Sequence, residues 1–344
     1  MGDRVFYIYS PPWVDWSAGT KVLHYLCDAL NKIGEDSFLA IHGPKSKFEE
    51  TRFGLETPIL NKKLVEQHRR ELKHTIVIYP EGITGNPLGG STTVRWLLNY
   101  PSLLGGTKVF SKEENVWAYS RNIAEGYFLL SKVNIPVLFI PAIELAEIDS
   151  VSQESAILGK YEVLYAQKFR ALGGKPEVRS ENRIIEITRF NLDSTSRSET
   201  LNLVKFAQKV HVFENTSIAS EAALFGTPVI CHKNKLFDTL IAEHELGIDG
   251  ISWHPSTGMV TNPVNARRKL EEAWISVSQN LVLALQNTAM RPDSLTLQSE
   301  ISLPNRSVFS KHVFSRARVL IQQKGLVVFG RFMMNYVRRI INQV

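Results

Sequence analysis

Apolar residues in this chain gather into short runs that alternate with amphipathic stretches. Residues 5–9 form a compact apolar run, and residues 20–33 carry apolar side chains three and four positions apart, the spacing of one helix face. Two further runs, 38–41 and 75–79, are rich in β-branched and aromatic residues. Such runs are typical of buried parallel strands. The pattern therefore predicts a strand, a loop, a helix and two more strands.

The same alternation continues along the chain. Residues 94–98 suggest a short helix, residues 137–140 suggest a strand, and a domain boundary is expected near residues 145–155. Beyond that boundary the pattern starts again. The expected strands are 163–166, 184–187, 210–213 and 229–231, and the expected helices are 199–208 and 217–225.

Strands that alternate with helices in both halves predict an α/β protein with two Rossmann-like domains. The chain has 344 residues, which is longer than one typical hydrophobic core. We expect an N-terminal domain at 1–150, a second domain at 151–310 and a helical segment at 311–344. Two parallel sheets that face each other leave a cleft at the carboxyl ends of their strands, where open α/β sheets bind ligands.

Charge and composition narrow the range of partners. The chain has 40 Lys and Arg against 34 Asp and Glu, a net charge of +6, which favours anionic partners. The basic residues are scattered and no nucleic-acid-reading motif is present, so nucleic acid is not expected. The two cysteines stand in apolar stretches, and the nine histidines show no metal-binding spacing. We therefore expect neither a disulfide nor a metal site.

The chain carries no sign of a membrane span. No apolar run approaches the roughly 18 residues that cross a bilayer, and the N-terminus lacks the pattern of a signal peptide. These features favour a cytoplasmic protein that is soluble or bound to a membrane surface from outside.

Residues 211–231 place two glutamates around the start of a short helix. The Gly-Thr-Pro sequence after Phe225 ends that helix, because Gly takes the left-handed cap conformation and Pro cannot continue the turn. The helix must then begin near Thr216 or Ser217, where its free N–H groups and positive dipole end favour a phosphate. Glu221 lies about one turn further along, a position suited to accepting hydrogen bonds from ribose hydroxyls.

A capping box is the structural alternative for Glu221. That motif needs Glu or Gln three residues after the cap. Ser217 is followed at that distance by Ser220, and Thr216 is followed by Ala219. We therefore favour a ligand-binding role for Glu221 over a capping role.

This stretch resembles the retaining glycosyltransferases of GT-B architecture, among them enzymes of bacterial polysaccharide and lipopolysaccharide synthesis. The family carries a carboxylate, a short loop, a helix with a second glutamate, and an alanine-rich stretch that ends in Gly-x-Pro-Val. The residues that stand in this pattern are Glu214, Thr216, Ser217, Glu221, Ala222, Ala223, Gly226, Thr227, Pro228 and Val229. Six residues lie between the two glutamates, where most of the family has seven.

The resemblance implies a GT-B fold whose second domain holds a nucleotide diphosphate-sugar without any cofactor or metal. It implies catalytic roles for Glu214 and for Lys168, since a lysine after a strand neutralises charge on a departing phosphate. Arg189 follows the next strand and is expected to contact the base or a phosphate. Gly19 lies in the small-residue loop that opens the first helix, where glycine allows close approach of a diphosphate. Asn215, beside Glu214, joins the donor-binding residues.

The first half of the chain is expected to hold the acceptor. Its Gly- and Pro-rich loop at residues 79–90 contains Glu81 and Asn86, and functional residues concentrate in such loops. A plain connector is the alternative for this loop. Asp15 and Glu81 are candidate general bases if the reaction inverts the sugar configuration.

The last stretch of the chain is a basic amphipathic helix. Residues 325–344 mix large apolar side chains with Lys and Arg. Such a helix either lies on an anionic membrane surface or packs back on the first domain, as a terminal helix does in the resembled family.

The sequence predicts a hexosyl- or deoxyhexosyltransferase that moves a sugar from a nucleotide diphosphate donor to a saccharide or lipid-linked saccharide. Two alternatives remain open. One is a nucleotide-sugar epimerase on the same scaffold, and the other is a non-catalytic protein that binds membranes or polyanions.

Overall fold

A computed structural model describes residues 3–42, 50–103, 106–154, 160–188, 195–254 and 260–290. The described residues divide into two compact units. The first unit contains those up to Ile140 together with those from Ile275 onward, and the second contains those between Pro141 and Trp274. The predicted helical segment at 311–344 lies outside the described residues.

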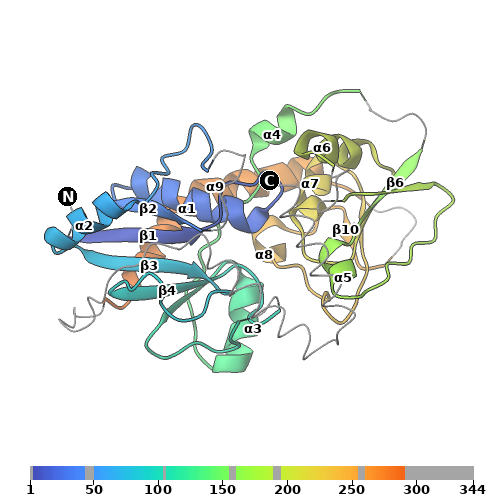
Figure 1. The fold of residues 1–344 in the computed structure, drawn as a ribbon. Helices are drawn as coiled ribbons and strands as arrows, with labels where there is room; N and C mark the ends of the chain where they lie inside the picture. Colours follow the sequence, from blue (N-terminus) through green and yellow to red (C-terminus); the bar gives the residue numbers. More distant parts are fainter. Residues whose placement is uncertain are drawn as a thin grey trace, which may run out of the picture. The chain divides into compact units, whose positions relative to one another are not determined.

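The first unit is built on a five-stranded parallel sheet with the strand order β2-β1-β3-β4-β5 (Figure 1). Its strands are β1 (Arg4–Ser10), β2 (Ser37–Ile41), β3 (His74–Pro80), β4 (Thr92–Leu97) and β5 (Asn115–Ala118). The central strands are buried on both faces, which explains why residues 5–9 and 75–79 read as unbroken apolar runs. The expected strands at 5–9, 38–41 and 75–79 are confirmed.

Two expectations for the first unit are wrong. Residues 94–98 were expected to form a helix, yet they belong mainly to β4, where β-branched and aromatic residues meet neighbours on both faces. Arg95 sits inside this strand with no exposed surface, and its charge is balanced by Glu114 at 2.9 Å. Residues 137–140 were expected to form a strand, but Val137 makes only an isolated bridge to Ala118.

The described part of the first unit also contains the helices α1 (Ala18–Lys32), α2 (Lys62–Arg70) and α3 (Arg121–Ser131) and the second part of α9 (Pro263–Gln286). α1 begins at Ser17, whose hydroxyl accepts a hydrogen bond from the N–H of Thr20. It then packs its apolar face against β1 and β2. The loop between β1 and the helix therefore lies at the carboxyl edge of the sheet.

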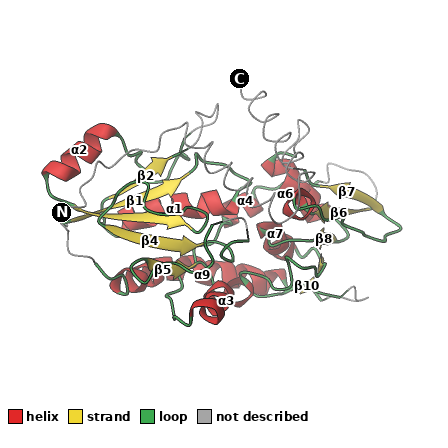
Figure 2. Cartoon of the chain, turned by 60° about the horizontal axis from the view of Figure 1, so that its bottom comes forward, coloured by secondary structure: helices red, strands yellow, loops and turns green. Residues whose placement is uncertain are grey.

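The second unit repeats the arrangement, with a parallel sheet in the order β10-β9-β8-β6-β7 (Figure 2). Its strands are β6 (Tyr161–Tyr165), β7 (Arg183–Glu186), β8 (Val210–Val212), β9 (Val229–Cys231) and β10 (Ile251–Ser252). Its helices are α4 (Leu145–Asp149), α5 (Gln167–Ala171), α6 (Arg197–Phe206), α7 (Ser217–Phe225), α8 (Glu243–Leu246) and the first part of α9 (Pro263–Gln286). Two parallel-sheet α/β units are thus present, and this part of the fold prediction is confirmed.

One face of the second sheet carries the hydrophobic core. Every second strand residue, such as Val163, Val212 and Cys231, points to this face and is buried against α6 and α7. α7 begins after Thr216 and ends at Gly226, whose φ of 76° is the left-handed cap conformation that glycine favours. Both ends of this helix are as the sequence predicted.

The buried histidine of α1 makes the stability of the first unit depend on pH. His24 has no exposed surface, and one ring nitrogen, Nε2, lies 3.0 Å from the carbonyl of Pro11. Burial lowers the pKa of His24 from 6.5 to about 4, although the hydrogen bond to Pro11 opposes this. The unfolded chain binds the proton first on acidification, so stability falls between these two values.

We predict that the free energy of unfolding falls by roughly 3 kcal/mol between pH 7 and pH 4 through this residue alone. Urea unfolding at a series of pH values measures the slope. The variant His24→Gln should flatten it, whereas the exposed His254→Gln should leave it unchanged. An equal slope in the wild type and His24→Gln would contradict this assignment.

Candidate functional site

The carboxyl edge of the second sheet brings three loops together. β8 lies between β6 and β9, and all three strands run parallel, so their polar loops leave the sheet at the same edge. These connections are Ala166 with the short helix α5 after β6, residues 213–216 after β8 and residues 232–241 after β9. Parallel pairing thus assembles residues that are far apart in the sequence.

Two predicted catalytic residues meet at this edge. The ammonium group of Lys168 lies 3.4 Å from the carbonyl oxygen of Asn215. The Glu214 carboxylate accepts a hydrogen bond of 2.9 Å from the N–H of Phe169, and its residue is only 6% exposed. The structure therefore brings Lys168 and Glu214 together. The Glu214 carboxylate joins α5, which follows β6, to the loop after β8.

Asn215 joins the same loops to the one after β9. Its side-chain amide donates to the carbonyl of Thr239 at 3.0 Å, and its side-chain oxygen accepts from the N–H of Ile241 at 2.9 Å. Both ends of the predicted donor-binding amide are therefore engaged with the backbone of the neighbouring loop. This contact fixes the position from which α7 begins.

The start of α7 lies directly after these contacts. Thr216 caps the helix through its hydroxyl, which accepts from the N–H of Ile218 at 3.3 Å. Thr216 and Ser217 are both partly exposed. A helix of this length has further N–H groups in its first turn that lack a partner inside the helix. The first turn of α7 and the ammonium of Lys168 thus bring positive charge to one edge.

Glu221 is placed differently from the ribose contact that the sequence suggested. It is 1% exposed, and its carboxylate lies 2.9 Å from a guanidinium nitrogen of Arg197 at the start of α6. Arg197 also contacts Glu147 of α4 at 2.8 Å. This arrangement ties three helices together and favours an internal role for Glu221. The ribose contact stays a prediction.

The remaining donor-binding candidates are Gly19 and Arg189. Gly19 belongs to the first unit, in the first turn of α1, where an added Cβ would make an ordinary contact of 3.8 Å with Leu98. Its backbone thus does not demand glycine. Arg189 lies outside the described residues.

The acceptor-side candidates all make hydrogen bonds within the first unit. Glu81 is 9% exposed and accepts from the N–H of Leu98 at 3.0 Å. Asn86 accepts from the hydroxyl of Tyr79 at 2.9 Å and donates to the carbonyl of Gly90 at 2.8 Å. Asn86 therefore shapes its Gly- and Pro-rich loop.

Asp15 lies in the loop after β1. Its exposed carboxylate accepts from the indole N–H of Trp13 at 2.6 Å. The acceptor roles of Asp15, Glu81 and Asn86 stay predictions.

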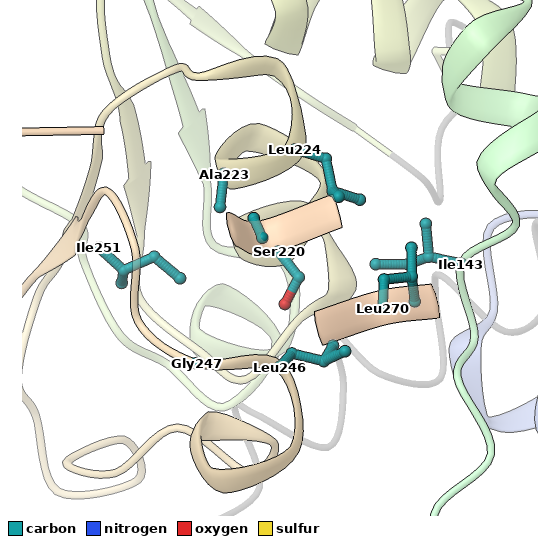
Figure 3. Close-up of a pocket in the computed structure, with 9 residues that line it drawn as sticks. Ile143, Ser220, Ala223, Leu224, Leu246, Gly247, Ile251 and Leu270 are labelled. Carbon is teal, nitrogen blue, oxygen red and sulfur yellow. The ribbon is translucent and has the colours of Figure 1, made fainter. Parts of the chain in front are cut away.

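A small apolar cavity lies beside α7 but is not a substrate site. Ser220, Leu224, Leu246 and Leu270 are among the residues that line it (Figure 3). Its volume of about 10 Å³ is no more than one water molecule needs. The cavity is a gap in the packing of α7 against its neighbours.

A chain of polar side chains lies on the other face of the second sheet and was not predicted from the sequence. The Nε2 atom of His211 lies 2.8 Å from the Glu162 carboxylate, and its Nδ1 atom lies 2.9 Å from Nε2 of His232. Glu162 and His211 stand at alternate positions between core residues of their strands, a period-2 signal of side chains on one face. The sequence offered no reason to assign a functional role to His211 or His232.

Neither a metal-binding group nor a membrane-spanning helix is found among the described residues. No group of three or more His, Cys, Asp or Glu residues is arranged to hold a metal ion within those residues. Among the helices described there, none has the length and apolar character to span a bilayer.

The Arg197–Glu221 pair provides a stability test. We predict that Arg197→Met lowers the free energy of unfolding by about 3–5 kcal/mol, because it leaves the buried Glu221 carboxylate without its cation. Urea unfolding measures the change. The matched control is Arg170→Met, which breaks a partly exposed pair with Glu186 and should cost less than about 1 kcal/mol. Similar losses in both variants would show that Glu221 does not depend on Arg197.

Comparison with known proteins found neither a matching family model nor a matching curated protein. Solved structures similar to this chain include a sucrose-phosphate synthase from Thermosynechococcus elongatus, with 11% identity, a TM-score of 0.47 and coverage of 82% of this chain and 98% of that one. A glycosyltransferase from Rickettsia africae has 11% identity, a TM-score of 0.42 and coverage of 91% and 98%.

A third similar structure is WaaG, a glycosyltransferase involved in lipopolysaccharide biosynthesis. It has 10% identity, a TM-score of 0.37 and coverage of 94% of this chain and 100% of that one. Likeness at this level does not show a shared activity.

Proposed function

We propose that this protein is a glycosyltransferase whose second unit binds the diphosphate of a nucleotide-sugar donor at the carboxyl edge of its sheet. The observation that carries the proposal is the meeting of Lys168 with the loop that begins α7. The motif around residues 214–229, which resembles that of retaining GT-B enzymes, supports the same ligand.

The charges at this edge suit a leaving diphosphate. When a glycosidic bond to a phosphate oxygen breaks, negative charge grows on that oxygen, and fixed positive groups nearby lower the barrier. The first turn of α7 offers N–H groups and its positive dipole end, and Lys168 offers a full charge. These groups supply the stabilisation that a metal ion supplies in other transferases, so we propose a metal-independent reaction.

The acceptor is proposed to be a saccharide or a lipid-linked saccharide held by the first unit. The loops that carry Asp15, Glu81 and Asn86 support this assignment, because they follow strands β1 and β3 at the carboxyl edge of the first sheet. Retention of the anomeric configuration follows from the resemblance, and transfer of a hexose or deoxyhexose is part of the same proposal.

We predict that UDP, GDP or TDP raises the melting temperature of the wild type, because a ligand that binds only the native state stabilises it. Lys168→Ala should weaken that binding by roughly 10- to 100-fold, the effect of losing one charge-assisted hydrogen bond. Isothermal titration measures both affinities. The control is Lys175→Ala, which removes an exposed lysine from the same unit and should bind as the wild type does.

Two outcomes would contradict the proposal. If no nucleoside diphosphate binds, the non-catalytic alternative of a membrane- or polyanion-binding protein gains support. If Lys168→Ala and Lys175→Ala bind equally well, the ligand does not sit at the start of α7. A screen of nucleotide sugars for slow hydrolysis then identifies the donor, and a change of the sugar without transfer would favour the epimerase alternative.

A further inference from the structure

The polar chain of Glu162, His211 and His232, called the relay residues below, has a defined pattern of protons. Burial raises the pKa of the Glu162 carboxyl, but hydrogen bonds from Asn182 and His211 outweigh this and lower it, so the group is a carboxylate and only accepts. The Nε2 atom of His211 must then carry the hydrogen of the 2.8 Å contact. A neutral His211 has its lone pair on Nδ1.

This pattern fixes the ring of His232 as well. The Nε2 atom of His232 lies 2.9 Å from Nδ1 of His211. Because Nδ1 of His211 holds a lone pair, Nε2 of His232 must carry the hydrogen. The lone pair of a neutral His232 is then on Nδ1, which has no partner among the described residues. The two inner relay residues therefore hold His232 in the tautomer whose outer nitrogen accepts.

His232, the outermost relay residue, lies at the same edge of the sheet as the proposed diphosphate site. The N–H of His232 donates to the carbonyl of Val212, which places His232 level with the end of β8. Its ring stacks on Phe213 with a centroid distance of 4.2 Å and an interplanar angle of 2°. Phe213 directly precedes Glu214, and the carbonyl of Phe213 also accepts from the side chain of Asn234 at 2.9 Å. The ring of His232 is partly exposed there.

We propose that the relay residues take up one proton when an oxyanion of a phosphate ligand reaches Nδ1 of His232. A proton from solvent binds at Nδ1 of His232, and the hydrogen on its Nε2 passes to Nδ1 of His211. His232 is then neutral with an N–H that donates to the ligand, and the positive charge rests on His211 beside the Glu162 carboxylate. The relay residues gain one proton, and Nδ1 of His232 changes from acceptor to donor. The ligand class rests on the proposed function.

The surrounding groups explain why the relay residues bind an extra proton only when a ligand is present. Burial and the neighbouring His211 lower the pKa of His232 to about 4, and burial also lowers that of His211 despite Glu162. Lys209, whose ammonium lies 4.0 Å from the Glu162 carboxylate, adds positive charge that opposes a further proton on His211. At neutral pH and without a ligand, the relay residues hold no extra proton. An anion at Nδ1 of His232 favours the binding of one.

Two measurements on the full-length protein test the inference. Nitrogen-15 NMR of the histidine rings in the free wild type should show hydrogen on Nε2 and a lone pair on Nδ1 for both His211 and His232. Calorimetric titration with inorganic pyrophosphate at pH 7, in buffers of different ionisation heat, should show uptake of about one proton per ligand bound. His232→Gln and Glu162→Gln should reduce that uptake to near zero, and His244→Gln, which changes an exposed histidine, should not.

The outcomes separate this inference from the proposed function. Pyrophosphate that binds in a Lys168-dependent manner without proton uptake overturns the relay and leaves the proposed function standing. A free protein with hydrogen on Nδ1 of His232 overturns the relay whatever the ligand does, and this measurement does not require any variant to fold. If neither pyrophosphate nor UDP binds, the proposed function fails and the ligand of the relay fails with it.

Discussion

The parallel pairing of β8 with β6 and β9 is the constraint on which the second unit depends. Because the three strands run in one direction, their loops leave the sheet at one edge, and short contacts then hold these loops together. Glu214 joins the loop after β6 to that after β8, and Asn215 joins the latter to the loop after β9. These contacts hold the start of α7 in position. A single slip of register would separate all of them.

Glu214 and Glu221, the two glutamates of the motif, therefore stabilise the second unit. Glu214 satisfies a backbone N–H of α5, and Glu221 neutralises Arg197 where α4, α6 and α7 meet. Buried carboxylates are costly unless a cation or N–H groups surround them. Both glutamates meet that condition within the second unit. The positive edge is consequently supplied by the helix start and Lys168, with Glu221 holding the helix in place.

Much of this fold could be predicted from the sequence, because its central strands are buried and helices such as α1 and α7 are capped by side chains. The start of α7 and its end at Gly226 followed from local rules alone. The strand at residues 92–97 was missed because a buried Arg95 resembles the polar face of a helix until Glu114, far along the chain, is seen to balance it. The Arg197–Glu221 pair was missed for the same reason. Contacts between distant residues are not visible in the spacing of either one.

We propose that the edge formed by Lys168 and the start of α7 binds a diphosphate. The most direct test is a crystal structure of the protein with the nucleoside diphosphate that stabilises it best. We expect phosphate oxygens to lie within hydrogen-bonding distance of the first-turn N–H groups of α7 and of the ammonium of Lys168. A diphosphate bound anywhere else on the chain would contradict it.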